Sequence, residues 1–268
     1  MIEITNEEFN VLKKFVYNEI GISLKDCKKS MIDSRFQSIL LRENISNYTE
    51  YFNQKLQNKK SKDYEEFIHK ITTHHTFFYR EDKHYEYMVN SILPWIKTTV
   101  KDYDVRIWSA GCSTGEEPYT LAFYLNGYFE KKIWDKKILA TDISLEALDK
   151  ASKGVYFKKS LERLPNEYLE KYFNKEINEY KVDRKIKNEI IFRKFNLMDD
   201  FKFKKKFHVI FCRNVMIYFN QKTREKLVKK FENYLVDGGY LIIGVTESIT
   251  NLDGHNMKLI KPSIYRKI

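Results

Sequence analysis

Residues 106–120, RIWSAGCSTGEEPYT, decide the fold of this chain. The apolar run at residues 105–108 predicts a buried strand, and the small residues at 109–115 predict a tight loop. Glu116 and Glu117 then begin a helical pattern. A strand, a loop with glycine and a helix are typical of the first unit of a nucleotide-binding α/β sheet. Glycine in the loop lets the backbone approach a ligand closely.

The two carboxylates at the start of this helix narrow the choice of ligand. A helix N-terminus ordinarily attracts anions, but Glu116 and Glu117 make this one a poor site for a pyrophosphate. They favour a ligand with hydroxyl groups, an amino group or a positive charge, and S-adenosylmethionine has all three.

From about residue 102 the sequence alternates between strand-like and helix-like segments. The expected strands are 104–109, 137–142, 190–195, 207–212, 240–245 and 263–266, and the expected helices are 117–131, 144–153 and 222–236. Ser144 is the expected N-cap of the second helix, and Gly154 and Gly238 are expected to end the second and third. This order predicts a Rossmann-like, mostly parallel sheet, in which ligands bind beyond the carboxyl ends of the strands.

The first quarter of the chain shows only helical periodicity. Thr5 and Glu8 have the spacing of a capping box, and Gly21 is the expected end of that first helix. Further helices are expected over 25–43, after a Ser46 cap and after a Ser61 cap. Short amphipathic helices cannot bury their apolar stripes alone. We therefore expect a helical domain at 1–75, a connecting segment at 76–100 and the ligand-binding α/β domain at 101–268.

The alternation breaks at residues 155–189, which predicts a small inserted subdomain with a helix at 162–173 and a hairpin at 179–186. Residues 150–206 hold 17 Lys and Arg against 9 Asp and Glu, whereas residues 1–75 hold 12 and 11, within a chain of net charge +11. This surplus is either a solvated face or a docking surface for an acidic partner. The same alternatives hold for the basic residues Lys25, Lys28, Lys29, Arg35 and Arg42.

Composition excludes several classes of protein. No apolar stretch approaches the roughly 20 residues of a membrane span, and the acidic start lacks the positive region of a signal peptide. Cys27, Cys112 and Cys212 are odd in number and far apart. They predict a reduced, cytoplasmic protein without a disulfide framework.

Polar side chains stand at the ends of the expected strands. Asp142 ends the second strand, where an acidic residue binds ribose hydroxyls; the alternative is a role at the helix start, which Ser144 already fills. Arg213 and Asn214 interrupt an apolar run at the end of the fourth strand, and we expect them to face the ligand unless they form a salt bridge that closes the strand. Cys212 is expected to be a buried strand residue and not a nucleophile.

Two other patterns have simpler explanations. His74 and His75 are adjacent, but neighbouring side chains point apart and no further ligand follows at suitable spacing, so we expect no metal site. Residues 201–207, FKFKKKF, interleave aromatic and basic residues as single-strand nucleic-acid platforms do. A solvated turn before a strand explains them better.

Four motifs together resemble one family in order and spacing: TTHHTFFYRE at 72–81, the stretch at 106–120, ATDISLEAL at 140–148 and FCRNVMIYF at 211–219. The chain resembles CheR-type chemotaxis receptor (protein-glutamate) methyltransferases over nearly its whole length. The resemblance implies an S-adenosylmethionine-dependent enzyme that methylates glutamate side chains of chemotaxis receptors in sensory adaptation and releases S-adenosylhomocysteine.

Carried over by motif, the resemblance implies nine cofactor-binding residues: His74, Thr76, Arg80, Glu117, Asp142, Asn196, Leu197, Arg213 and Asn214. His74 departs from the asparagine usual in the family, and histidine is larger and gains charge near neutral pH. Some members bind a receptor tail with the inserted subdomain. Here residues 174–188 lack glycine, which favours an enzyme that acts without the tail.

The implied nucleophile also constrains the mechanism. A glutamate carboxylate is ionised at neutral pH, with a reference pKa of about 4.3, so we expect no general base, no metal and no covalent intermediate. Arg80 and Tyr218 are the expected catalytic residues, which orient the reacting groups, and Arg213 is a further candidate for this role. We expect Tyr218 nearest the transferred methyl group.

The expected partners are the cytoplasmic signalling helices of chemotaxis receptors, without nucleic acid or membrane insertion, and we expect a monomer. One rival is a nucleic-acid methyltransferase, which the pI of about 9.2 favours. The sequence has neither the Asn-Pro-Pro-Tyr-like nor the Pro-Cys motif that base methylation usually brings. The other rival is a catalytically inactive receptor-binding module, which only the departure at His74 supports.

Overall fold

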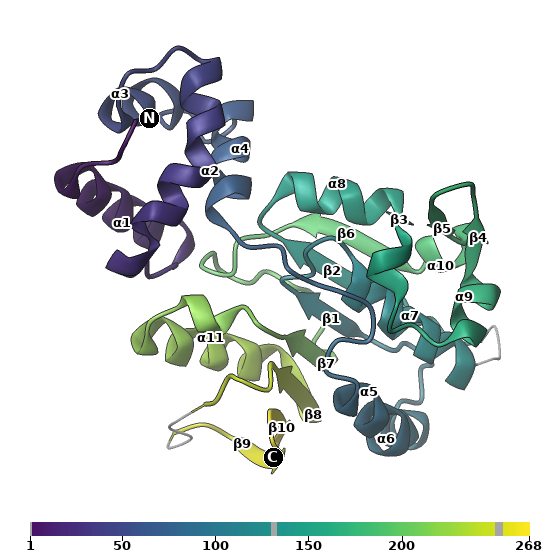
Figure 1. The fold of residues 1–268 in the computed structure, drawn as a ribbon. Helices are drawn as coiled ribbons and strands as arrows, with labels where there is room; N and C mark the ends of the chain where they lie inside the picture. The colour runs from purple at the N-terminus through teal and green to yellow at the C-terminus, as the bar shows by residue number, and fades with distance from the viewer. Residues whose placement is uncertain (1, 130–132, 250–253) are drawn as a thin grey trace.

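The computed structural model describes residues 2–129, 133–249 and 254–268. Figure 1 shows a helical N-terminal part beside a larger α/β part. The helical part contains α1 (Asn6–Ile20), η1 (Asp26–Lys28), α2 (Lys29–Arg42), α3 (Tyr48–Lys55) and α4 (Lys62–Ile71). Apolar residues on these helices, Leu12, Phe36 and Phe67 among them, are buried in one cluster.

Local cap signals decide where these helices begin and end. Thr5 and Glu8 form the predicted capping box on α1, and Gly21 ends that helix with a φ of 74°. Ser61 caps α4, also as predicted. These features depend on a few neighbouring residues, and the sequence pattern is sufficient to find them.

The α/β part is built on a sheet that has seven strands within the described residues, in the order β6-β2-β1-β7-β8-β10-β9. Five neighbouring strands are parallel: β6 (Ile190–Lys194), β2 (Ile138–Asp142), β1 (Ile107–Ala110), β7 (Phe207–Cys212) and β8 (Leu235–Ile243). β10 (Ile264–Lys267) and β9 (Met257–Lys261) complete the sheet in antiparallel pairing. The predicted Rossmann-like α/β fold is therefore confirmed.

Helices connect the strands and join the two parts of the molecule (Figure 1). They are α7 (Glu116–Tyr128), α8 (Leu145–Lys153) and α11 (Gln221–Tyr234), and the chain reaches the sheet from α4 through α5 (Lys83–Tyr87), η2 (Met88–Ile92) and α6 (Leu93–Thr99). Ser144 caps α8, and Gly154 ends it with a φ of 61°, as predicted. The predicted helix at 117–131 extends into residues 130 and 131, which lie outside the described residues.

Two predicted caps and some strand bounds are wrong. Asn47 caps α3 in place of Ser46, because its side chain accepts a hydrogen bond from the Glu50 N–H. Gly238 lies inside β8, not after a helix, because β8 begins at residue 235, directly after α11. β1 begins at residue 107 and not 104, and the edge strand β9 was not predicted.

Between α8 and β6 the chain forms a separate antiparallel sheet in the order β3-β5-β4. Its elements are β3 (Val155–Tyr156), η3 (Lys158–Leu161), α9 (Asn166–Tyr172), β4 (Phe173–Lys175), β5 (Tyr180–Val182) and α10 (Arg184–Lys187). The predicted hairpin at 179–186 is wrong. β5 pairs with β4 and β3, and Asp183 begins α10 immediately afterwards by accepting the Lys185 N–H.

The helical part is fixed against the carboxyl ends of the parallel strands. The Ser23 N–H donates to the Tyr218 carbonyl oxygen at 2.8 Å, and Ile22 forms an antiparallel bridge with Phe219. The Asn196 amide donates to the Glu19 carbonyl oxygen at 2.7 Å. These contacts position the end of α1 over the edge of the sheet at which ligands bind.

Candidate active site

A cavity of about 990 Å³, counting the solvent at its open mouth, lies beyond the ends of β1, β2, β6 and β7 and beneath the helical part. All ten residues predicted for cofactor binding or catalysis line it: His74, Thr76, Arg80, Glu117, Asp142, Asn196, Leu197, Arg213, Asn214 and Tyr218. The fold thus brings these side chains together, although no two of the four motifs are adjacent in the chain. Their individual roles stay predictions.

The loop after β1 brings backbone close to this cavity. Gly111 has a φ of 87° and Gly115 a φ of 100°, conformations that residues with a side chain rarely adopt. A Cβ at Gly111 would lie 2.4 Å from a methyl group of Val215. The Gly111 and Cys112 N–H groups both donate to the Thr141 carbonyl oxygen, at 2.8 and 2.9 Å, which fixes the loop on β2.

Asp142, the predicted ribose-binding residue, is held by backbone N–H groups. Its Oδ2 accepts from Ser113 at 2.8 Å and its Oδ1 from Ser144 at 3.0 Å. Burial raises the pKa of Asp142, and the hydrogen bonds from Ser144 and Ser113 act against that rise. Each carboxylate oxygen keeps acceptor capacity for a ligand in the cavity, since an ionised carboxylate has about four acceptor sites.

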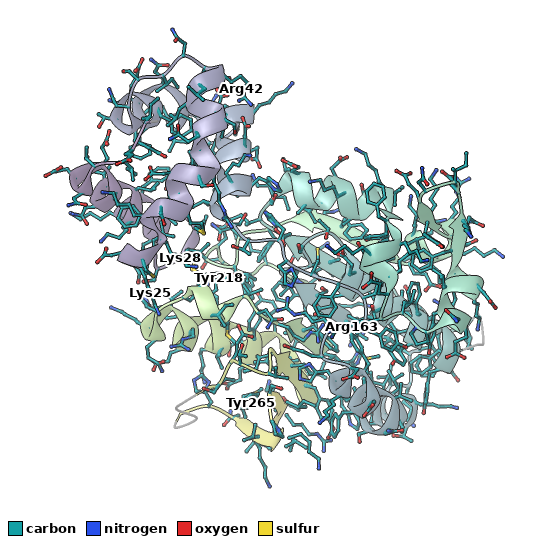
Figure 2. The ribbon with its side chains drawn as sticks, viewed as in Figure 1. Lys25, Lys28, Arg42, Arg163, Tyr218 and Tyr265 are labelled. Carbon is teal, nitrogen blue, oxygen red and sulfur yellow. The ribbon has the colours of Figure 1, made fainter. Side chains whose placement is uncertain are left out.

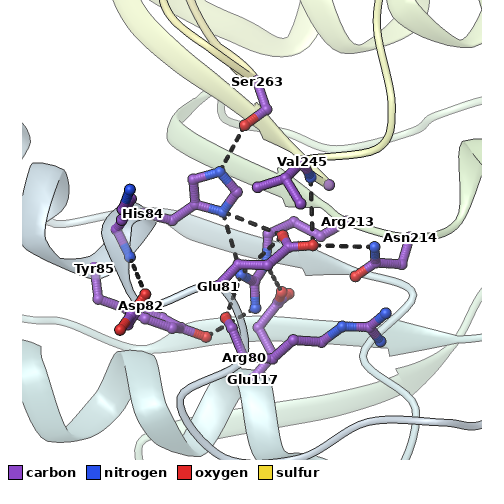
Figure 3. A network of polar contacts seen from close by, with 12 residues as sticks. Arg80, Glu81, Asp82, His84, Tyr85, Glu117, Arg213, Asn214, Val245 and Ser263 are labelled. Carbon is purple, nitrogen blue, oxygen red and sulfur yellow. Dashed lines mark hydrogen bonds and ion pairs between the residues drawn. The ribbon is translucent and has the colours of Figure 1, made fainter.

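Glu117 and Arg213 form a buried ion pair (Figure 3). Arg213 Nε donates to Glu117 Oε2 at 2.6 Å, and the Ser109 hydroxyl donates to Glu117 Oε1 at 2.7 Å. Glu117 is 9% exposed and Arg213 is 7% exposed. Burial acts to lower the pKa of Arg213, but the Tyr85 hydroxyl and the Glu117 carboxylate more than offset it, so the net shift is upward. The salt-bridge alternative for Arg213 is therefore present, although the residue also lines the cavity.

The rest of the Arg213 guanidinium fastens the connecting segment to the sheet. It donates to the Arg80 carbonyl oxygen at 2.7 Å, the Tyr85 hydroxyl at 2.9 Å and His84 Nδ1 at 3.2 Å. His84 in turn contacts the Ser263 hydroxyl at 2.7 Å. With these donors occupied, Arg213 holds its neighbours in place through bonds within the protein.

Sequence reasoning missed two carboxylates that shape the cavity. Glu247 accepts the Asn214 and Gly244 N–H groups with Oε2, at 2.9 and 2.6 Å, and the Ile217 N–H with Oε1 at 3.0 Å. It therefore holds the loops after β7 and β8 together. Glu81, which has a φ of 58°, accepts from the Asn214 side-chain amide at 3.2 Å. The sequence offered one indication of Glu247: it is a carboxylate that follows an apolar strand by four residues.

His74 lines the cavity from the segment that joins the two parts. Its ring stacks on His69 of α4 at 4.4 Å between centroids, and its Nε2 lies 2.9 Å from the Thr72 hydroxyl. His69 Nδ1 lies 2.9 Å from the Ser144 hydroxyl at the start of α8. His74 thus belongs to a contact between the two parts of the molecule. Within the described residues, no group of three or more His, Cys, Asp or Glu is arranged to hold a metal ion.

Arg80, Thr76 and Tyr218 line the cavity with few other polar bonds. Arg80 donates to the His75 carbonyl oxygen at 2.7 Å, and its guanidinium carbon lies 5.8 Å from the centre of the Phe77 ring. The Tyr218 hydroxyl has no hydrogen-bond partner among the residues that the structure describes. Figure 2 shows Tyr218 at the junction of the helical and α/β parts.

Asn196 and Leu197 follow β6, at the side of the cavity formed with α1. The Asn196 side chain is occupied, because it donates to the Glu19 carbonyl oxygen and accepts the Met198 N–H at 3.0 Å. Leu197 is buried. The helical part adds Ile20 and Ile22 to the lining, and sequence reasoning did not predict this contribution.

Comparison with known proteins decides the family. Residues 74–264 match the model "CheR methyltransferase, SAM binding domain", and residues 7–72 match "CheR methyltransferase, all-alpha domain". The chain belongs to the CheR methyltransferase family. It is 43% identical to a chemotaxis protein methyltransferase of Borreliella burgdorferi, with 99% of this chain and 96% of that protein covered. It is 30% identical to the chemotaxis protein methyltransferase of Escherichia coli, with coverages of 94% and 88%.

The cavity fits the cofactor of the CheR family, S-adenosylmethionine. Asp142 lines the cavity at the end of β2, the position at which an acidic residue binds ribose hydroxyls in sheets of this kind. Leu197 and Phe195 give an apolar wall, and the ion-paired Glu117 also lines the cavity. In the described part of this CheR-family chain, no helix is both long and apolar enough to cross a bilayer.

Proposed function

We propose that this CheR-family methyltransferase transfers a methyl group to glutamate side chains of chemotaxis receptors and forms methyl esters. The observation that carries the proposal is the composition of the cavity. Within it, Arg80 carries positive charge without a carboxylate partner among the described residues, whereas the Arg213 cation is neutralised by Glu117. An unpaired guanidinium beside the cavity suits an anionic substrate group.

The proposed reaction requires the protein mainly to position the reacting groups. S-adenosylmethionine supplies a methyl group that the sulfonium charge already activates for transfer. A substrate carboxylate needs no deprotonation at neutral pH. Arg80 orients this carboxylate, and Tyr218 fixes its approach to the methyl carbon. Positioning of this kind contributes up to about 7–11 kcal/mol to a barrier reduction, and removal of water from the carboxylate adds to it.

The proposed partners are the signalling helices of chemotaxis receptors, which places the enzyme in the cytoplasm. Two surfaces are candidates for docking. One is the inserted segment 155–189, which holds 9 Lys and Arg against 7 Asp and Glu. The other is the pair Lys25 and Lys28 before α2, whereas Arg42 lies at the far end of that helix (Figure 2). Ser23, two residues before Lys25, bonds to Tyr218, so that end of the helical part borders the cavity. We expect activity on purified receptor to fall as ionic strength rises. Activity that stays flat would contradict docking by charge.

The experiment is incubation of the protein with methyl-labelled S-adenosylmethionine and the cytoplasmic fragment of a chemotaxis receptor, followed by mild base. Release of volatile labelled methanol identifies a carboxyl ester and supports the proposal. Base-stable label on added nucleic acid identifies a nucleic-acid methyltransferase, and no label on either substrate identifies an inactive binding module. Either of these results would overturn the proposal.

A further inference from the structure

A further arginine, which lies outside the cavity lining, has no role in the proposed reaction. Arg163 lies in the turn between η3 and α9, and its guanidinium carbon stands 4.7 Å from the centre of the Phe77 ring. Arg80 lies over the same ring at 5.8 Å. Phe77 therefore contacts both Arg80, which lines the cavity, and Arg163, which does not. Arg163 is labelled in Figure 2.

Arg163 is available to a partner. Its side chain is exposed, and in the part of the chain that the structure describes no carboxylate lies within ion-pair distance of it. Stacking on an aromatic face leaves the N–H edge of a guanidinium free, and this edge matches a carboxylate with two parallel hydrogen bonds. The stack also reduces the conformational freedom that an exposed arginine would lose on binding.

The spacing of the two guanidinium groups limits what they can bind together. Because both distances are measured to the same ring centre, the two guanidinium carbons are at most 10.5 Å apart. An α-helix rises about 5.4 Å per turn, so two turns cover about 10.8 Å. Residues three, four or seven positions apart share a face of a helix. One helical segment can therefore present one carboxylate to Arg80 and another to Arg163.

We propose that Arg163 is a specificity-determining residue, which binds an acidic side chain one or two helical turns from the glutamate that is methylated. This inference rests on the proposed function and adds a requirement to it: the substrate helix carries a second carboxylate on the same face.

The test compares Arg163→Glu with Arg184→Glu. Both residues are exposed, lie between α8 and β6, and undergo the same change of charge, so Arg184→Glu reports the nonspecific effect of charge. The substrates are helical peptides from a receptor methylation region, in which each acidic residue three, four or seven positions from the methylated glutamate is replaced by Gln in turn. The readouts are kcat, KM for peptide and the Kd of S-adenosylhomocysteine.

We expect Arg163→Glu to lower kcat/KM about tenfold more than Arg184→Glu, mainly through KM, with the S-adenosylhomocysteine Kd unchanged. With the wild-type enzyme, one Gln-substituted peptide should be methylated more slowly than the unsubstituted peptide. With Arg163→Glu, the same peptide substitution should have little further effect, because the ion pair between Arg163 and that acidic residue is already broken. Two results would overturn this inference and leave the proposed function standing. One is an equal fall in kcat/KM for Arg163→Glu and Arg184→Glu. The other is that, for every peptide, the effect of the Gln substitution is the same with Arg163→Glu as with the wild-type enzyme. Absence of methyl ester with the wild-type enzyme would overturn both.

Discussion

At the scale of single residues, the cavity contains two kinds of polar side chain. Glu117, Arg213 and Asn196 are bonded within the protein and fix the shape of the site. Tyr218 is different, since the residue lines the cavity and its hydroxyl has no hydrogen-bond partner within the described residues. A free hydroxyl at this position is available to the substrate, and this difference makes Tyr218 the more informative residue to change.

Tyr218→Phe removes that hydroxyl and little else. We expect kcat to fall about tenfold, the cost of roughly one hydrogen bond made in the transition state. The Kd of S-adenosylhomocysteine should not change. Tyr103→Phe, on an exposed tyrosine outside the cavity, is the matched control. Unchanged turnover in Tyr218→Phe would remove the residue from the mechanism.

Asp142→Asn tests the ribose contact. The amide group puts N–H donors next to the Ser113 or Ser144 N–H, and it replaces a charged acceptor with a neutral one. We expect the Kd of S-adenosylhomocysteine, measured by calorimetry, to rise by about ten- to a hundredfold, or roughly 1.5–3 kcal/mol. Asp149→Asn on the exposed side of α8 is the control. A Kd within twofold of wild type for Asp142→Asn would exclude the contact.

At the scale of elements, the loop between β1 and α7 forms part of the cavity wall. Its glycines have positive φ, and a Cβ at Gly115 would lie 2.9 Å from the Cβ of Ala151 on α8. The loop, α7 and α8 therefore pack as one unit. Gly127, near the end of α7, is different because a Cβ there meets no atom within 4 Å.

The pair Gly115→Ala and Gly127→Ala tests this packing in urea unfolding. We expect Gly115→Ala to lower the unfolding free energy by about 1–3 kcal/mol, through strain at positive φ and contact with Ala151. Gly127→Ala should raise it by up to about 1 kcal/mol, because alanine is the better helix former. Equal effects at both positions would show that the loop is not packed as described.

The helices and strands also show which features of the fold can be predicted from the sequence. The caps at Thr5, Ser61 and Ser144 and the polar ends of the strands were predictable, because each depends on residues close in sequence. The junction of α11 and β8 was not, because the chain passes from helix to strand without a loop. Glu247 was missed for a different reason: two of its three partners, Asn214 and Ile217, lie 33 and 30 residues away and become its neighbours only in the folded protein.

At the scale of the whole molecule, buried histidines link stability to pH. His208 is 5% exposed, and its Nδ1 accepts the Arg106 N–H at 3.0 Å. Burial, reinforced by the nearby Arg106 charge, lowers the pKa of His208 to about 4. His84 is similar, with a pKa lowered to about 4 by burial and by Arg213. As pH falls below 6.5, the unfolded chain binds protons that the folded protein does not, so these groups reduce stability between pH 7 and 4.

His208→Asn keeps an acceptor for the Arg106 N–H and removes the titrating ring. We expect the unfolding free energy of the wild type to decline more steeply between pH 7 and pH 5 than that of the variant, by about 1–2 kcal/mol over the interval. Parallel curves for the two proteins would mean that His208 is protonated as readily in the folded state as in the unfolded state.

The whole molecule also explains why the helical part belongs to the site. Ile20 and Ile22 line the cavity opposite the strand ends, and the Asn196 amide ties β6 to the end of α1. His69 and His74 stack where α4 meets the start of α8. The amphipathic pattern predicted the helices but not this placement, because packing between distant segments leaves no periodic signal in the sequence.

The central claim is that this cavity delivers a methyl group to a glutamate carboxylate. Tandem mass spectrometry of a receptor fragment, after incubation with S-adenosylmethionine and the wild-type protein, tests it most directly. The account predicts the mass of one methyl group on a glutamate side chain, and loss of that signal when the glutamate is replaced by Gln. A methyl group on lysine, arginine or another nitrogen atom, or an unmodified receptor, would contradict it.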